Sequence, residues 1–133
     1  MTIYLLDSSV LIAMSALDHA DRSRIRRWVR GVTKFAACPI TEGAVVRYFL
    51  RVGCYIDEAQ DTLRDLTRHP GYEFWPDDLS YADADLGNII GHKQATDAYL
   101  AALTRTRPGA KLATLDVALS KAHPDVVELI PEI

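Results

Sequence analysis

Residues 3–10 read Ile-Tyr-Leu-Leu-Asp-Ser-Ser-Val, and the interpretation of the whole chain starts from this stretch. A short apolar run that ends abruptly in polar residues is typical of a buried strand. Asp7 then lies at the carboxyl end of that strand, and Ser8 or Ser9 is expected to cap a helix over residues 10–17. Open α/β sheets bind ligands at the carboxyl ends of parallel strands, so Asp7 is either a helix cap or part of a site.

Strands and helices alternate along the rest of the sequence. This alternation favours an α/β fold with a mainly parallel sheet, because helical crossovers join parallel strands. Val52 and Ile56 are expected on the buried faces of their helices. The further strands are expected at 35–38, 72–75, 111–115 and 126–130, and the helices at 10–17, 22–30, 42–52 (capped by Thr41), 57–69, 81–90, 95–106 and 117–122.

Length and composition are those of one globular domain over residues 1–133, with 49% apolar and 25% charged residues. The net charge of −3 disfavours RNA binding by overall charge alone. The sequence shows no leader-like segment and no apolar run of about 18 residues, which favours a cytoplasmic protein without a membrane span. In a reducing compartment, Cys38 and Cys54 are expected to be buried free thiols.

Acidic residues stand where expected strands lead into helices. Asp7 follows the first strand, Glu42 the second and Asp116 the fourth, while Asp97 opens a helix without a strand directly before it. In a parallel sheet the first three converge on one edge. Two carboxylates about 5 Å apart repel by roughly 3 kcal/mol at an effective dielectric near 20, so such a cluster calls for cations. Carboxylates suit Mg²⁺ or Mn²⁺, which can promote phosphodiester cleavage.

The other charged residues have simpler interpretations. The helix at 22–30 carries five arginines, which form a solvated face or a contact for phosphates or for an acidic partner. Arg47 and Arg51 lie four apart on one helix face and are expected to hold RNA phosphates or the acidic end of a partner protein. An acidic loop and helix start accounts for Asp77, Asp78, Asp83 and Asp85, and surface positions account for His19, His69, His92 and His123.

Four short motifs follow one another along the chain: Leu-Asp-Ser-Ser-Val at 6–10, Thr-Glu at 41–42, Ala-Thr-Asp-Ala at 95–98 and Leu-Ala-Thr-Leu-Asp at 112–116. None is specific alone. In this order and at these spacings, the chain resembles PIN-domain ribonucleases of the VapC toxin type over its whole length. The resemblance implies a three-layer α/β/α fold, an RNA substrate, Mg²⁺ or Mn²⁺, a homodimer and an antitoxin that blocks the site.

The same resemblance assigns roles to individual residues. It makes catalytic and metal-site acids of Asp7, Glu42, Asp97 and Asp116. It gives supporting positions to the neighbouring hydroxyl residues Ser8, Ser9, Thr96 and Thr114, with one of the two serines orienting the first acid. Gly43 departs from the family pattern, in which a larger apolar residue commonly follows the glutamate.

Two other functions stay open. A PIN fold kept only for binding RNA or protein would be expected to lack one or more of the four acids. Other magnesium-dependent phosphoryl-transfer proteins of the α/β class also carry an Asp after the first strand. A dehalogenase-like phosphatase, however, has a second Asp two residues later, where this chain has Ser9. A response receiver would lack Glu42 and Asp97 in these contexts.

Overall fold

The computed structural model of the chain describes residues 2–87 and 89–132. Within this part five strands form, namely β1 (Ile3–Leu6), β2 (Lys34–Ala37), β3 (Tyr72–Phe74), β4 (Lys111–Thr114) and β5 (Val127–Leu129). The helices that connect them are α1 (Ser8–Ser15), α2 (Arg22–Val29), α3 (Pro39–Arg51), α4 (Ile56–Thr67), the short 3-10 helix η1 (His92–Gln94), α5 (Ala95–Arg105) and α6 (Val117–Ala122).

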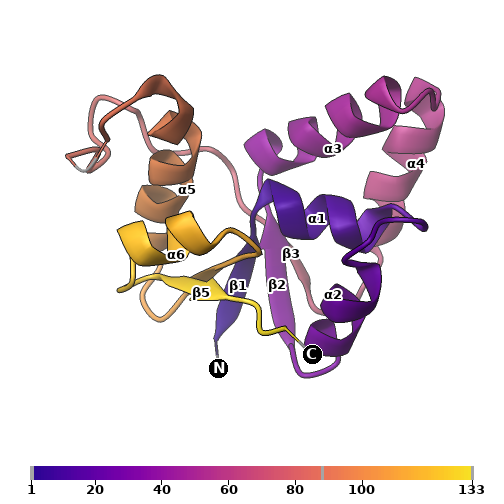
Figure 1. Ribbon diagram of the computed structural model, residues 1–133, viewed down its shortest axis with the longest axis horizontal. Coiled ribbons are helices and arrows are strands. Elements are labelled where there is room, and N and C mark those ends of the chain that lie inside the picture. Colours follow the sequence, from indigo (N-terminus) through magenta and orange to yellow (C-terminus); the bar gives the residue numbers. More distant parts are fainter. Residues whose placement is uncertain (1, 88, 133) are drawn as a thin grey trace.

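The strands form one sheet in the order β3-β2-β1-β4-β5, and every neighbouring pair is parallel (Figure 1). Strand β1 is central, with Leu5 beside Ala36 of β2 and Leu112 of β4. The predicted α/β fold with a parallel sheet is therefore confirmed. Because all strands point the same way, the segments that follow them start from one edge of the sheet.

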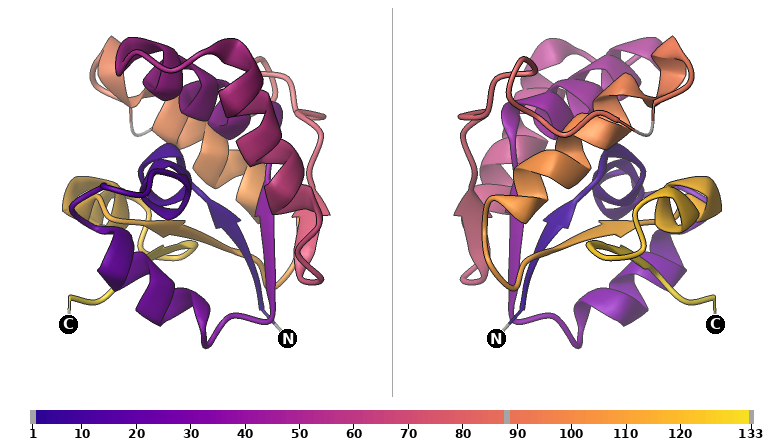
Figure 2. Two further views of the ribbon diagram at one scale, coloured as in Figure 1. Left: turned by 90° about the vertical axis from the view of Figure 1, so that its right-hand side faces the viewer. Right: turned by 90° about the vertical axis from the view of Figure 1, so that its left-hand side faces the viewer.

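Helices cover both faces of the sheet and complete the predicted three layers. Successive strand residues point to opposite faces, so Leu5 and Leu6 enter different cores. Leu5 packs with Leu100 of α5 and Leu119 of α6. Leu6 packs with residues of α1 to α4, among them Val10 and Phe49. Helices α1 to α4 accordingly lie on the right in Figure 1 and α5 and α6 on the left, and Figure 2 gives two side views.

Two helices begin earlier than the sequence indicated. The N-cap of α1 is Asp7, whose Oδ1 accepts a hydrogen bond from the backbone N–H of Val10 at 3.1 Å. The prediction that Ser8 or Ser9 caps this helix is wrong, because the carboxylate is already in capping position. Helix α3 begins at Pro39, and its Thr41 is the third helical residue rather than the cap. Proline is well suited to a first helical turn because it has no N–H that needs a partner.

The helix expected at 81–90 does not form among the described residues of that range. Side chains there bond to nearby backbone instead: Ser80 Oγ accepts from the N–H of Ala82 at 3.1 Å, and Asp85 Oδ1 from that of Gly87 at 3.2 Å. Local bonds of this kind compete with helix formation. The loop is anchored where the ring of Tyr81 stacks on that of Tyr99, with centroids 4.4 Å apart.

Val52 and Ile56 were expected to be buried but are 56% and 49% exposed. Both flank the turn between α3 and α4, where Gly53 adopts a positive φ of 94° and reverses the chain. Their side chains leave the helical stripe at this turn. Cys38 and Cys54 are free thiols; Cys38 is buried, but Cys54 is only partly so. In the described part of the chain, no helix is long and apolar enough to cross a membrane.

Candidate active site

Asp7 is the most buried of the four predicted acids, with only 5% of its surface exposed. Its Oδ1 accepts hydrogen bonds from Ser9 Oγ at 2.6 Å and from the backbone N–H of Val10 at 3.1 Å. Its Oδ2 accepts one from the Thr114 hydroxyl. Burial raises the pKa of Asp7 above its usual range, although these hydrogen bonds act in the opposite direction. The carboxylate is thus fixed in orientation before any ligand arrives.

Thr114 links the first acid to the last. While it donates to Asp7, its Oγ1 accepts the backbone N–H of Asp116 at 2.9 Å. Asp116 in turn is the N-cap of α6, where its Oδ1 accepts the N–H groups of Ala118 at 2.8 Å and Leu119 at 3.3 Å. Strand β4 pairs with β1, so this hydroxyl fixes two strand ends relative to each other.

Asp97 is the third residue of α5 and is not its cap, a position that Gln94 occupies. Its pKa is raised from 3.8 to about 6, first by burial and then by the negative charges of Asp7 and Asp116. Asp97 and Asp116 also line one cavity between α5 and α6, of about 210 Å³. The helix that carries Asp97 does not follow a strand directly, yet it brings this acid to the same site.

Glu42 lies in the first turn of α3 and is half-buried. Burial raises its pKa, and the negative charge of Asp77 raises it further. The sequence alone predicts no function for Asp77 beyond a place in an acidic loop. A signal was present: Asp77 comes three residues after β3, and β3 ends at the same edge of the sheet as β2. The acids thus divide into Asp7, Asp97 and Asp116 on one side and Glu42 with Asp77 on the other.

Among the described residues, no three His, Cys, Asp or Glu side chains lie close enough together to form a ready metal cage. Nor do the ion pairs found there involve any of these five acids. Mg²⁺, however, usually keeps several waters and takes only one or two carboxylates besides the substrate phosphate. Asp97, whose pKa is raised by burial and by neighbouring negative charges, suits such an ion, with Asp97 and Asp116 as the residues to hold it.

The other predicted residues lie around this centre. Ser8 is half-buried in the first turn of α1, and Thr96 is exposed beside Asp97. Arg51 is exposed and places its guanidinium 5.8 Å from the ring centre of Tyr48. Arg47 is also exposed, and a Cβ at Gly43 would come within 3.4 Å of its Nη1. The glycine that departs from the family pattern therefore leaves room for the Arg47 side chain.

The expectation that all four histidines lie on the surface is wrong for His123, which is only 6% exposed. Its Nδ1 lies 3.0 Å from Nη2 of Arg105, and burial together with this guanidinium lowers the pKa of the imidazole. His69 and His92 are exposed, and His19 is half-buried. His123 is the C-cap residue of α6, and its backbone N–H donates to the carbonyl of Leu119.

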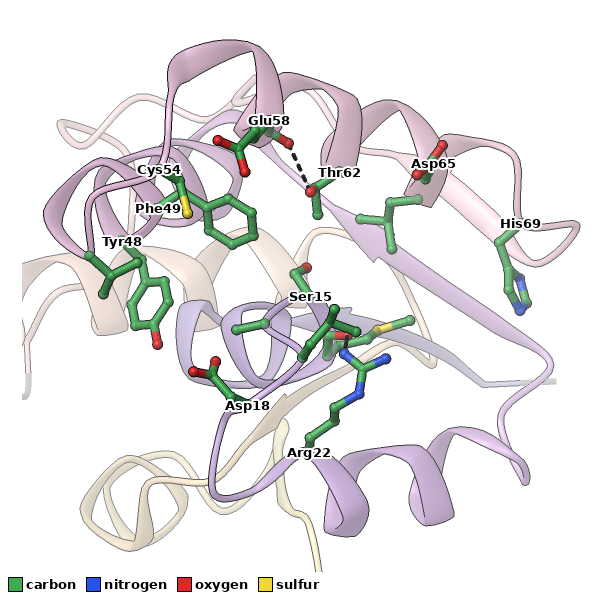
Figure 3. A pocket seen from close by; sticks show the side chains of 15 residues that line it. Ser15, Asp18, Arg22, Tyr48, Phe49, Cys54, Glu58, Thr62, Asp65 and His69 are labelled. Atoms are coloured by element: carbon green, nitrogen blue, oxygen red, sulfur yellow. Dashed lines mark hydrogen bonds between the residues drawn. The ribbon is translucent and has the colours of Figure 1, made fainter.

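A larger cavity of about 600 Å³ lies elsewhere, among α1, α3, α4 and the start of α2 (Figure 3). Phe49 and Leu66 contribute apolar surface to it, while Arg22, Glu58 and Asp65 contribute charge. None of the four predicted acids is among the described residues that line this cavity. It is therefore separate from the acidic centre.

Curated relatives of the chain have names that agree with the resemblance seen in its motifs. Ribonuclease VapC29 of Mycobacterium tuberculosis is 42% identical over 128 residues, which cover 96% of this chain and 96% of the relative. Ribonuclease VapC38 of the same organism is 36% identical over 119 residues, 84% of each protein. No protein-family model matches the chain.

Solved structures share the fold. The toxin VapC20 of Mycobacterium tuberculosis, described as cleaving the sarcin–ricin loop, matches with a TM-score of 0.73 over 96% of this chain and 99% of its own, at 15% identity. A chain of VapBC2 from Rickettsia felis, solved with a promoter DNA fragment, matches with a TM-score of 0.64, covering 97% and 99% at 15% identity. At such low identity these matches establish the common architecture alone.

Proposed function

Since this chain belongs to the VapC family of PIN-domain proteins, we propose that it is an endoribonuclease and the toxin of a toxin–antitoxin pair. The identity of 42% over nearly the whole of both chains supports this assignment. The observation that carries it is that Asp7 and Asp116 follow the neighbouring parallel strands β1 and β4, and that burial, followed by the negative charges of these two acids, raises the pKa of Asp97.

Each acid has a distinct part in the proposed reaction. Mg²⁺ or Mn²⁺, when bound, supplies positive charge that stabilises the developing charge of the cleaved phosphodiester. Asp97 and Asp116 hold the ion, and Asp7, fixed in orientation by Ser9 and Thr114, contributes a negative charge that acts on Asp97. Glu42 completes the acidic edge from α3. In the ion-free protein the pKa of Asp97 is about 6, and a bound cation would favour its charged form.

The test is cleavage of total RNA by the purified chain, with and without EDTA. We expect cleavage in Mg²⁺ or Mn²⁺, none in EDTA, and a loss of orders of magnitude in Asp7→Asn. The matched control is Asp61→Asn on α4, which removes an exposed carboxylate paired with Arg64 and should cleave as the wild type does. Cleavage by Asp7→Asn at the wild-type rate would refute the assignment, and a chain that binds RNA without cutting it would be a non-catalytic module.

The proposal extends to partners. A ribonuclease that cuts the RNA of its own cell needs an inhibitor, and a chain of the same fold is part of the solved VapBC2 structure, which is bound to promoter DNA. We expect a small protein encoded beside this chain to cover the acidic site, and the toxin itself to act as a cytoplasmic homodimer. Co-expression should give an inactive complex whose size, measured by light scattering, fits a toxin dimer with bound antitoxin. An uninhibited mixture of the two proteins would contradict this.

A further inference from the structure

Asp116 also lines a second cavity, whose other walls come from α1, α3 and the segment between α1 and α2. This cavity has a volume of about 450 Å³ and runs from Ser9 and Asp116 to Tyr48 and Arg51 on α3. The cavity between α5 and α6 shares Asp116 with it, so the acid stands between two openings. A polymeric substrate bound across the acids can therefore extend into this pocket, whose volume is within the range of about 300–1,000 Å³ that is typical of small-ligand sites.

The far end of this pocket is aromatic. Tyr48 is half-buried and also lines the larger cavity drawn in Figure 3, where it projects from α3 toward the segment between α1 and α2. The centre of its ring lies 6.4 Å from that of His19, and the Arg51 guanidinium lies 5.8 Å from the same ring. Ile12 and Leu115 add apolar surface to the walls. Flat rings between apolar walls, with a cation at the rim, are the features that bind bases of single-stranded nucleic acid.

Polar groups in the pocket narrow the choice of ligand. His19 Nδ1 accepts the backbone N–H of Asp21 at 3.1 Å, so the neutral imidazole carries its proton on Nε2 and can donate it. The carboxylates of Asp21 and Asp116 also line the pocket. Their negative charges repel a phosphate inside the pocket but not a neutral base, and they can accept hydrogen bonds from the amino groups of that base. Arg51, at the exposed rim, is the group available to a phosphate.

We propose that this pocket is a nucleobase subsite, which holds the base beside the scissile phosphate of RNA stacked on Tyr48. The inference rests on the ribonuclease function proposed above and adds a substrate-positioning role for Tyr48 and His19. Arg51 then binds the phosphate that follows this base away from the acids. Stacking accepts any base, whereas the His19 donor and the two carboxylates favour a base that offers both an acceptor and an amino group.

The experiment compares Tyr48→Phe, which keeps a ring, with Tyr48→Leu, which removes it. Tyr55→Leu is the control, because Tyr55 is a 76% exposed aromatic residue at the start of α4 and does not line the pocket. Binding is measured in an Asp97→Asn background with RNA octamers that carry 2-aminopurine at one position each. A stacked 2-aminopurine loses fluorescence, so the labelled position with the strongest quenching is the one whose base occupies the pocket. Thermal melts check that each variant is folded.

We expect strong quenching at one position, retained in Tyr48→Phe and Tyr55→Leu and lost in Tyr48→Leu. Affinity should fall about 5- to 150-fold in Tyr48→Leu, the range that stacking of one base spans. An octamer that lacks the base at that position should bind the wild type as weakly as the intact octamer binds Tyr48→Leu. Its affinity should not fall further in Tyr48→Leu. With Asp97 intact, Tyr48→Leu should raise KM for cleavage far more than it lowers kcat. If Tyr48→Leu does not fold, His19→Leu is used in the same assay.

The outcomes separate this inference from the function on which it rests. If the wild type cleaves RNA but no position shows quenching that depends on Tyr48, the subsite is refuted and the ribonuclease stands. If Tyr48→Leu weakens inhibition by the antitoxin and leaves RNA binding unchanged, the pocket is a protein contact and the subsite is again refuted. If the wild type neither binds nor cleaves RNA in Mg²⁺ or Mn²⁺, both proposals fail together.

Discussion

At the scale of single residues, one hydroxyl organises the acidic centre. Thr114 donates to Asp7 and accepts from the backbone of Asp116, so it satisfies two groups that belong to different segments. It is itself fully buried, at 0% exposure. A buried polar group left without its partner costs about 1–3 kcal/mol. The threonine therefore contributes both to stability and to the geometry of the acids.

Thr114→Val tests this role, since valine keeps the shape of the side chain and removes the hydroxyl. We expect the free energy of unfolding to fall by about 1–3 kcal/mol, because the Asp116 N–H and one Asp7 oxygen lose their partner. Cleavage should fall as well, as Asp7 is held less firmly. Thr114→Ser, which retains the hydroxyl, is the control and should recover most of both. Urea unfolding and RNA cleavage are the measurements, and a fully stable, fully active valine variant would contradict the bridging role.

Asp97 makes the stability of the ion-free protein depend on pH. Its folded pKa of about 6 lies above the value of about 3.9 for an unfolded chain. The unfolded state then loses its proton first as pH rises, so this residue destabilises the fold progressively between about pH 4 and 6 and fully above that. In EDTA, wild type should lose stability across this window relative to Asp97→Asn. Parallel curves for the two proteins, from urea unfolding at several pH values, would show that the pKa is unshifted.

At the scale of elements, two acids of the proposed site also cap helices. Asp7 caps α1 and Asp116 caps α6, each with its side chain bonded to backbone N–H groups of the first turn. The sequence offered capping and site membership as alternative roles for Asp7; the structure shows the cap, and the proposed site adds the second role. Asp97 is different, because Gln94 is the N-cap residue of α5 and Asp97 does not cap the helix.

Two substitutions of Asp116 separate its capping from its chemistry. Asparagine caps helices about as well as aspartate, whereas alanine costs about 0.5–2 kcal/mol at such a position. We therefore expect Asp116→Asn to keep the wild-type stability in EDTA and Asp116→Ala to lose this amount. Both should lose most of the RNA cleavage, since neither can help to hold a cation. Equal cleavage by Asp116→Asn and wild type would leave Asp116 as a cap alone.

The elements also show why some predictions failed. Strands β1, β2 and β4 were predictable because apolar runs end sharply at Asp7, Pro39 and Asp116. The helix expected over 81–90 failed because Ser80 and Asp85 bond to nearby backbone, a competition that periodicity does not reveal. The apolar pattern also continued past Arg51 to Val52, although Gly53 turns the chain there.

At the scale of the whole molecule, the parallel sheet determines which acids meet. The convergence of Asp7 and Asp116 follows from β1 and β4 being neighbours, and strand order could not be read from the sequence. Asp97 joins them through the packing of α5, a tertiary contact without a local signal. The same applies to Asp77, whose charge acts on Glu42 only because β3 pairs with β2. Strand order and helix packing, rather than local sequence pattern, therefore determine which acids lie close together.

The whole fold should respond to a divalent cation if these acids form its site. An ion that binds only the folded state stabilises it, by about 2.7 kcal/mol at a concentration 100 times its Kd. Mn²⁺ should therefore raise the Tm of the wild type above its value in EDTA and relieve the repulsion at Asp97. Asp97→Asn begins without that repulsion, so it should melt no lower than wild type in EDTA and gain much less from Mn²⁺. The control Asp61→Asn, in which the acidic edge is intact, should gain as much as wild type. A Tm rise of equal size in Asp97→Asn would place the ion elsewhere and return this residue to the first turn of α5 as an ordinary helical acid.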